Sequence, residues 1–173
     1  LIQTITVGAG GATSIEFTSI PQNGTDLLLT FSGRSNKSAS TNEPLVITAN
    51  GGTSYAYVGA YLLNYDNYLF NQATIPITGA LPAATSSVLD SFSNIQVYIA
   101  NYAVDSWVKL AGINGAMAAG GSTGFVHLYG ANIAPTSAIT SVKLVPQTGP
   151  NFVQYSTASL YKITKGSGGA SVA

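Results

Sequence analysis

The chain has 173 residues, of which only 7% are charged: six Lys or Arg balance six Asp or Glu. Soluble domains carry about 25% charged residues, so this scarcity argues against catalysis, and the lack of a basic surplus argues against nucleic-acid binding. The absence of cysteine excludes disulfides, thiol catalysis and Cys-ligated metals. No run of about 18 apolar residues indicates a membrane span, while the 46% apolar content predicts a folded chain.

Short runs with β-type alternation follow one another along the chain. The clearest run lies at 26–34, where Leu27, Leu29 and Phe31 share one face of the expected strand. Strands are expected, in order, at 1–7, 14–18, 26–34, 45–49, 95–99, 107–113, 125–133, 139–145 and 152–163.

The segments between these runs are rich in turn residues. The glycine cluster at 8–11 predicts a hairpin between the first two strands, and Asn-Gly-Gly at 50–52 predicts a tight turn. Residues 71–87 look irregular, and 115–124 look flexible because of their glycines. The best helical candidate is 83–92.

About eight to ten short strands at this spacing predict an all-β fold, an antiparallel β-sandwich of the jelly-roll kind. We expect one domain over residues 1–165, followed by a flexible Gly/Ser/Ala tail at 166–173.

The titratable residues form no catalytic pattern. The six acids are scattered, with no pair at a spacing that a glycosidase would need; they are Glu16, Asp26, Glu43, Asp66, Asp90 and Asp105. The single histidine, His127, has no Cys partner for a metal, and we expect it on the polar face of a strand. No catalytic, cofactor-binding or metal-binding residue is assigned, and no cofactor is expected.

An aromatic cluster offers the best candidate contact residues, which are Tyr55, Tyr57, Tyr61, Tyr65 and Tyr68. Tyrosine rings pack at core edges or protein interfaces, or stack on sugars. All three interpretations remain open here. For the lone Trp107 a place in the core is favoured over a stacking platform.

Residues 14–21 read Ser-Ile-Glu-Phe-Thr-Ser-Ile-Pro and continue at 25–29 and 32–35; near the other end, 138–142 and 151–161 form a second set. Together these segments resemble a group of tailed-phage virion proteins, found as short stand-alone proteins and as distal modules of tail fibres. The resemblance implies a β-sandwich on the virion surface without enzymatic activity.

Within the resembling segments, two charged residues suit a framework role. Asp26 is expected to accept backbone hydrogen bonds at the start of its strand. Arg34 is expected to have a structural role, although pairing with an acid or a neighbouring subunit is the alternative.

Two hypotheses for function follow. The first is a capsid decoration (cement) or head-fibre protein that binds phage capsid protein as a homo-oligomer, with a trimer favoured. The second is a tail-fibre receptor-binding module that contacts host glycans through aromatic side chains. Neither involves nucleic acid or a membrane, and both place the protein on the virion surface.

Overall fold

The computed structural model describes residues 1–38, 41–52, 57–63, 66–72, 77–83, 91–120, 123–134, 136–148 and 150–165. Of residues 57–58, 61–63, 66–72, 77–80, 119–120, 123 and 134 only the backbone is described. The helical candidate at 83–92 falls mostly, and the expected tail at 166–173 entirely, outside the described residues.

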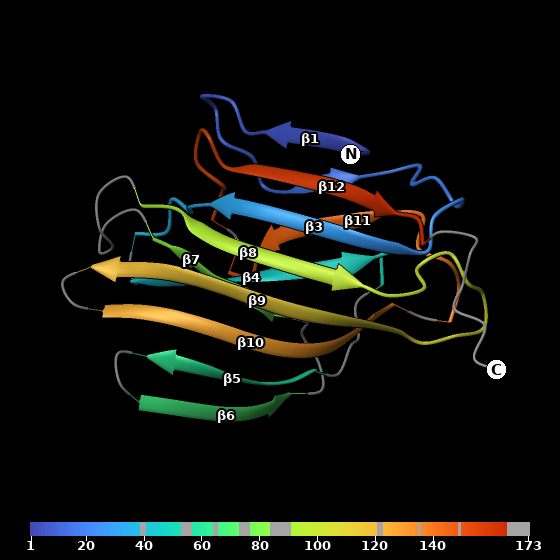
Figure 1. Ribbon diagram of the computed structural model, residues 1–173. Coiled ribbons are helices and arrows are strands. Elements are labelled where there is room, and N and C mark those ends of the chain that lie inside the picture. The colour runs from blue at the N-terminus through green and yellow to red at the C-terminus, as the bar shows by residue number, and fades with distance from the viewer. Residues whose placement is uncertain are drawn as a thin grey trace.

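The described chain consists of strands and connecting turns, which confirms the all-β prediction (Figure 1). The strands are β1 (Gln3–Thr6), β2 (Ile15–Phe17), β3 (Asp26–Gly33), β4 (Asn42–Ala49), β5 (Tyr57–Leu63), β6 (Asp66–Gln72), β7 (Ile77–Pro82), β8 (Ser93–Ile99), β9 (Lys109–Gly120), β10 (Thr123–Ala134), β11 (Val142–Pro146) and β12 (Thr157–Ile163). A helix long and apolar enough to cross a membrane does not occur among the described residues.

The strands form two sheets that lie one behind the other in Figure 1, in a sandwich-like arrangement. The larger sheet has eight strands in the order β1-β12-β3-β8-β9-β10-β5-β6, and the smaller has four in the order β2-β11-β4-β7. All pairings between neighbouring strands are antiparallel. The chain passes between the sheets repeatedly, so segments from both ends share one core. The jelly-roll topology stays a prediction.

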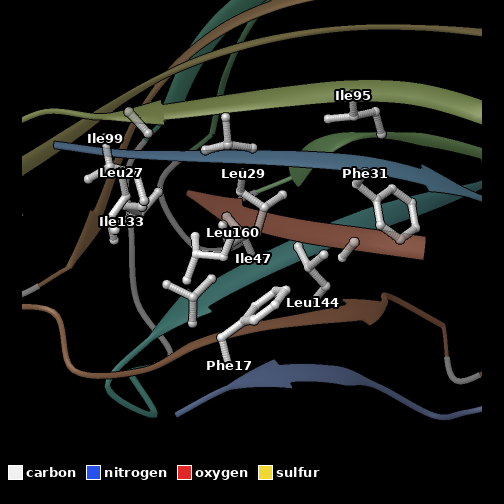
Figure 2. Packing of buried hydrophobic residues seen from close by; sticks show 14 of the residues in the cluster. Phe17, Leu27, Leu29, Phe31, Ile47, Ile95, Ile99, Ile133, Leu144 and Leu160 are labelled. Carbon is white, nitrogen blue, oxygen red and sulfur yellow. The ribbon is translucent and has the colours of Figure 1, made fainter. Parts of the chain in front are cut away.

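The main hydrophobic core lies between the two sheets and follows directly from the alternation in the sequence (Figure 2). Leu27, Leu29 and Phe31 of β3 are buried as predicted, and Phe17 of β2 and Leu144 of β11 face them from the smaller sheet. Full burial of one such side chain stabilises a fold by about 1.5–3 kcal/mol. The phenyl rings of Phe31 and Phe152 pack with their centroids 5.5 Å apart.

Two expectations about irregular segments are wrong. Residues 71–87 include the end of β6 and all of β7, an edge strand of the smaller sheet, where a terminal Pro82 is tolerated. Residues 115–120 continue β9 instead of forming a flexible segment. Gly115 fits there for a packing reason: a Cβ at this position would lie 2.9 Å from the Ile95 side chain.

The glycine hairpin at 8–11 is also wrong, because β1 and β2 belong to different sheets. The segment is a turn closed by a hydrogen bond from the Gly11 N–H to the Gly8 carbonyl, and it carries the chain across the sandwich. Gly11 has a φ of +70°, a conformation that favours glycine. The tight turn at 50–52 is confirmed, since the Gly52 N–H donates to the Ala49 carbonyl.

Candidate functional site

Most carboxylates with described side chains have structural partners. Glu43 is fully buried, bonded to the N–H and hydroxyl of Thr148 and paired with Lys37 at 2.7 Å. Glu16 is exposed and lies 3.9 Å from Lys143 on the outer face of the smaller sheet. Among the described residues, no group of three or more His, Cys, Asp or Glu side chains gathers in a metal-binding arrangement.

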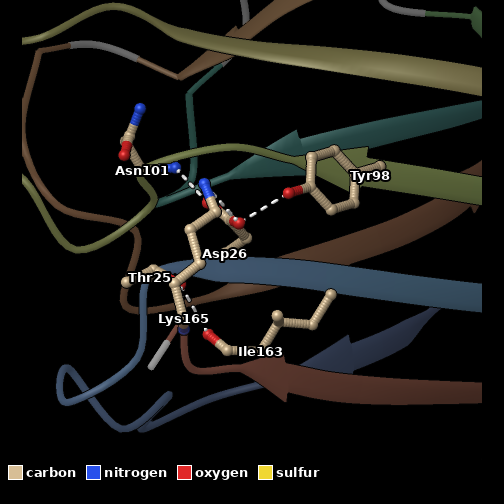
Figure 3. A network of polar contacts seen from close by, with 6 residues as sticks. All are labelled: Thr25, Asp26, Tyr98, Asn101, Ile163 and Lys165. Carbon is tan, nitrogen blue, oxygen red and sulfur yellow. Dashed lines mark hydrogen bonds and ion pairs between the residues drawn. The ribbon is translucent and has the colours of Figure 1, made fainter. Parts of the chain in front are cut away.

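Asp26 is the centre of a polar network where β3 begins (Figure 3). The Tyr98 hydroxyl donates to its Oδ2 at 2.5 Å, the Asn101 N–H donates to its Oδ1 at 2.9 Å, and the Lys165 ammonium lies 2.9 Å from Oδ2. The backbone hydrogen bond expected of Asp26 is therefore confirmed. The network ties β8, the following loop and the segment after β12 to β3.

Burial acts to raise the pKa of Asp26, but the hydrogen bonds from Tyr98, Asn101 and Lys165 outweigh it, so its pKa lies below the ordinary value of 3.8. The hydrogen bond to Asp26 raises the pKa of Tyr98. A carboxyl with a lowered folded-state pKa stabilises the fold above its unfolded pKa, and this stabilisation disappears as the pH falls through the folded pKa.

Replacing the carboxylate tests this network. In Asp26→Asn the amide nitrogen faces either the Asn101 N–H or both the Tyr98 hydroxyl and the Lys165 ammonium, so the free energy of unfolding should fall by about 1–3 kcal/mol. The matched control is Glu16→Gln, since the exposed Glu16–Lys143 pair contributes about 0–1 kcal/mol. Urea denaturation at neutral pH followed by circular dichroism measures both, and equal stability of the two variants would contradict a structural role for Asp26.

Arg34, like Asp26, is buried, and its guanidinium donates to the Ser91 carbonyl at 3.2 Å. The backbone around it also pairs with the chain before β12, where the Val153 N–H donates to the Arg34 carbonyl at 3.0 Å. These contacts agree with the structural role favoured from the sequence.

His127 does not lie on a polar face, so that prediction is wrong. It is 3% exposed on the inner face of β10, because it shares the alternation of Tyr129 and Ala131 rather than that of Val126. Its Nδ1 and the Tyr129 hydroxyl share a hydrogen bond of 2.5 Å, whereas its Nε2 has no partner. Burial lowers the pKa of His127 from 6.5 to about 4, which keeps the ring neutral at pH 7.

The predicted tyrosine cluster is only partly described. Tyr55 and Tyr65 lie outside the described residues. The backbones of Tyr57, Tyr61 and Tyr68 lie in β5 and β6, where Tyr61 is the cross-strand partner of both Tyr68 and His127. Their side chains are outside the description, so their contact role stays a prediction.

Trp107 is not in the core, so the favoured expectation for this residue is wrong. It lies in the loop between β8 and β9 and is 58% exposed. Val104 and Val108 in the same loop, and Leu110 just after it, are exposed as well. The apolar pattern of this loop does not predict which of its side chains are exposed. Their exposure depends on the residue at which β9 begins.

The loop is held by a buried ammonium. Lys109 is fully buried, and its Nζ donates to the carbonyls of Val104 at 2.5 Å, Trp107 at 2.6 Å and Thr136 at 3.1 Å. The Asp105 carboxylate accepts from the Ala138 N–H at 2.9 Å. Burial lowers the pKa of Lys109, and the nearby Asp105 partly offsets this.

Across its five described central strands, the outer face of the larger sheet has uncharged outward residues, with Asp26 as the exception. Its outward residues, which alternate with the buried ones, we term the neutral face: Leu28, Thr30, Ser32, Asn94, Gln96, Tyr98, Leu110, Gly112, Asn114, Ala116, Val126, Leu128, Gly130, Thr157, Ser159 and Tyr161. Asp26, at the start of β3, is fully buried and pairs with Lys165, whose side chain is 61% exposed, so one charged group lies at this end of the face. The exposed fractions of Leu110 and Leu128 reach 64% and 67%, so apolar groups form part of this surface.

Two adjoining hollows mark the neutral face. One, of about 270 Å³, is lined by β8, β9 and β10 through side chains that include Asn94, Gln96, Asn114, Ala116 and Val126. The other, of about 360 Å³, lies over β12, β3 and β8, with hydroxyl and amide groups from Thr30, Ser32, Asn94, Thr157 and Ser159. Sequence analysis missed this surface, although the lack of charge in 94–98, 110–118 and 126–132 was a signal for it.

Comparison of the chain with models of protein families, with curated proteins and with solved structures finds no significant match.

Proposed function

We propose that the chain is a non-enzymatic structural protein of a tailed-phage virion surface, a capsid decoration or head-fibre subunit that binds capsid protein through its neutral face. The phage assignment rests on the resemblance of the two terminal segments. The mode of action rests on one observation, the scarcity of charge on the outer face of the larger sheet.

That face has the composition of a protein-binding surface. Large contiguous apolar patches are uncommon on free monomers and mark contact sites, and charged residues are depleted at the centres of protein interfaces. Leu110, Val126 and Leu128 supply the apolar groups, while Asn and Ser side chains nearby can form hydrogen bonds at the rim. Many copies bound to one capsid would multiply a weak contact by avidity.

Leu128→Lys tests this function. A lysine there places a charge among the uncharged outward residues of β9 and β10, so binding to purified capsids should weaken at least tenfold, about 1.4 kcal/mol. The matched control is Thr18→Lys beside β2 of the other sheet, where the side chain is exposed and binding should be unchanged. Cosedimentation with capsids gives the affinity, and electron microscopy of labelled particles gives the location; equal binding of both variants would contradict the proposal.

The second candidate is a tail-fibre receptor-binding module that contacts host glycans. The hollow of about 360 Å³ favours it, since hydroxyl and amide side chains there can form hydrogen bonds with an uncharged sugar. Particles labelled only at the tail tip, together with glycan-array binding that Asn94→Leu abolishes, would favour this candidate over capsid decoration.

A further inference from the structure

The strand at one edge of the larger sheet, β1, is open to pairing with another strand. It pairs with β12 on one side, and no described strand pairs with its other side. Figure 1 shows β1 at the margin of the sheet. Natural proteins often prevent edge-to-edge pairing with a charged residue or a proline on the edge strand. Residues 1–15 contain neither.

The other sheet edges that the structure describes differ in this respect. β2, at one edge of the smaller sheet, carries the exposed carboxylate of Glu16. At its other edge β7 ends with Pro82, and β6, at the far edge of the larger sheet, begins with Asp66. Among these four edges, β1 is therefore the one that has neither a charge nor a proline.

The backbone of β1 presents hydrogen-bonding groups to its open side. The Val7 N–H donates to the Ser156 carbonyl at 2.8 Å, so the polar backbone groups of Val7 face β12. In an antiparallel ladder this direction alternates from residue to residue. The groups of Ile5 therefore also face β12, whereas the N–H and carbonyl groups of Thr4 and Thr6 face away from the sheet.

The side chains of the two threonines agree with this assignment. Thr4 lies opposite Ser159 and Thr6 lies opposite Thr157, and the hydroxyls of these pairs are 2.8 Å and 3.1 Å apart. Side chains approach closely in the non-hydrogen-bonded pairs of an antiparallel ladder. Each copy of the chain therefore has two backbone donors and two backbone acceptors free for another strand at Thr4 and Thr6.

The open side of β1 is complementary to itself. Thr4-Ile5-Thr6 reads the same in both directions. When a second β1 approaches antiparallel about a two-fold axis at Ile5, Thr4 of each copy lies opposite Thr6 of the other, so each outward N–H meets an outward carbonyl. Opposed threonines stabilise a sheet. The two Ile5 side chains meet on the inner face, where Ile5 packs against the core but is only partly buried.

Charge does not oppose this contact. The charged side chain closest along β12 is Lys162, which follows the residues paired with β1 and donates to the Asn23 side chain at 2.6 Å. It lies next to the start of β1. Because the two copies of β1 run antiparallel, the two Lys162 residues lie at opposite ends of the contact, away from each other.

We propose that two copies of this chain associate edge to edge through β1 about a two-fold axis at Ile5, which joins their larger sheets into one. A second copy is the favoured occupant because the open side of β1 complements itself, as a two-fold interface requires. The contact lies at the edge of the sheet and leaves both neutral faces uncovered. It therefore goes beyond the proposed function, and it would give each dimer two capsid-binding faces.

A single cysteine tests the axis, since the chain has none of its own. Across the axis, the Cα atoms of the two Ile5 residues would be about 4.5 Å apart, within the range of about 4.4–6.8 Å that a disulfide spans. The two Thr4 residues would be diagonal neighbours about 7–8 Å apart. Under a mild oxidant, Ile5→Cys should therefore form disulfide-linked dimers at least tenfold faster than Thr4→Cys.

Thr4→Cys is a strict control, because Thr4 is exposed whereas Ile5 is half-buried. Random collision would favour the more exposed thiol. Equal rates of cross-linking, or a faster reaction of Thr4→Cys, would overturn the proposed axis.

A proline tests the hydrogen bonds without a cross-link. Thr6→Pro removes an N–H that faces the open side, and proline is tolerated at such a position of an edge strand. Thr6→Val is the matched control, since both variants lose the hydroxyl contact with Thr157 but valine keeps the N–H. Both should unfold near the same urea concentration, whereas the dissociation constant of the dimer should be at least tenfold higher in Thr6→Pro than in Thr6→Val.

Sedimentation equilibrium over a concentration series measures this association. A wild-type monomer at all concentrations, a trimer, or equal association of Thr6→Pro and Thr6→Val would overturn the dimer. A monomer that still binds capsids, with the loss expected in Leu128→Lys, would overturn the dimer and leave the proposed function intact. A dimer linked through Ile5→Cys that binds no capsid would do the opposite.

Discussion

Between pH 6.5 and pH 4 the free energy of unfolding should fall by about 3 kcal/mol because of one residue, His127. Burial lowers the pKa of this histidine from 6.5 to about 4 in the folded chain. In the unfolded chain the ring binds a proton below about pH 6.5. The unfolded state therefore holds more protons throughout this interval, so stability decreases as the pH falls.

The size of the effect follows from the shift. Each unit of pKa difference corresponds to 1.36 kcal/mol, and about 2 kcal/mol should be lost by pH 5. Above pH 6.5 the contribution of His127 should not change with pH. Asp26 also contributes to the free energy of unfolding, but this contribution is lost only below its ordinary pKa of 3.8, because the folded-state pKa of that carboxyl is lowered.

Two measurements check this prediction. Urea denaturation of wild type between pH 7 and pH 5 should show the decline, whereas His127→Gln should show a flat profile, whatever its stability at pH 7. Because His127 is the only histidine, a single imidazole resonance in an NMR titration reports its pKa directly. A midpoint near 6.5, or the same decline in His127→Gln, would contradict the buried neutral ring.

The sequence predicts this fold well where apolar alternation is strong. In β2, β3 and β8 the apolar residues at every second position are the buried ones, so burial can be assigned from the period alone. The structural role of Asp26 at the start of β3 was also predictable, since its carboxylate accepts a backbone hydrogen bond as turn-forming aspartates do.

Prediction fails where the neighbouring strands decide the conformation. The second half of β9 is rich in Gly and Ala, which have low strand propensity, yet it pairs with β8 and β10 over most of its length. Close packing also explains the glycine at position 59 of β5, where an added Cβ would lie 2.4 Å from the ring of the cross-strand partner Tyr129. Such glycines indicate close packing, which a single sequence cannot distinguish from a flexible loop.

The candidate surface was harder to predict than the core. Charge scarcity correctly indicates an uncharged surface, but its position depends on the strand order, which brings distant segments into one sheet. Trp107 and His127 show the reason most clearly. A tryptophan is usually buried, but Trp107 lies in the loop just before β9 begins and is exposed. A lone strand histidine is usually exposed, but His127 lies on the inner face of β10 and is buried.

Replacement of the buried Lys109 should have the second large effect. Lys109→Met keeps the length of the side chain but removes the donor of three hydrogen bonds, to Val104, Trp107 and Thr136. Hydrogen bonds to a charged group contribute about 1.5–3 kcal/mol each to stability. Because the variant no longer has the desolvation cost of a buried charge, we expect the free energy of unfolding to fall by a net amount of about 3 kcal/mol. The matched control is Lys143→Met, an exposed lysine whose replacement should cost under about 1 kcal/mol.

Trp107→Ala is a second control for Lys109→Met. It removes an exposed side chain, so it should leave the free energy of unfolding nearly unchanged. Lys109→Met keeps the indole but removes the hydrogen bonds that hold the loop, so it should lower the free energy of unfolding and speed hydrogen exchange of the amides at 103–110. Unchanged exchange and unchanged stability in Lys109→Met would contradict the ammonium clamp.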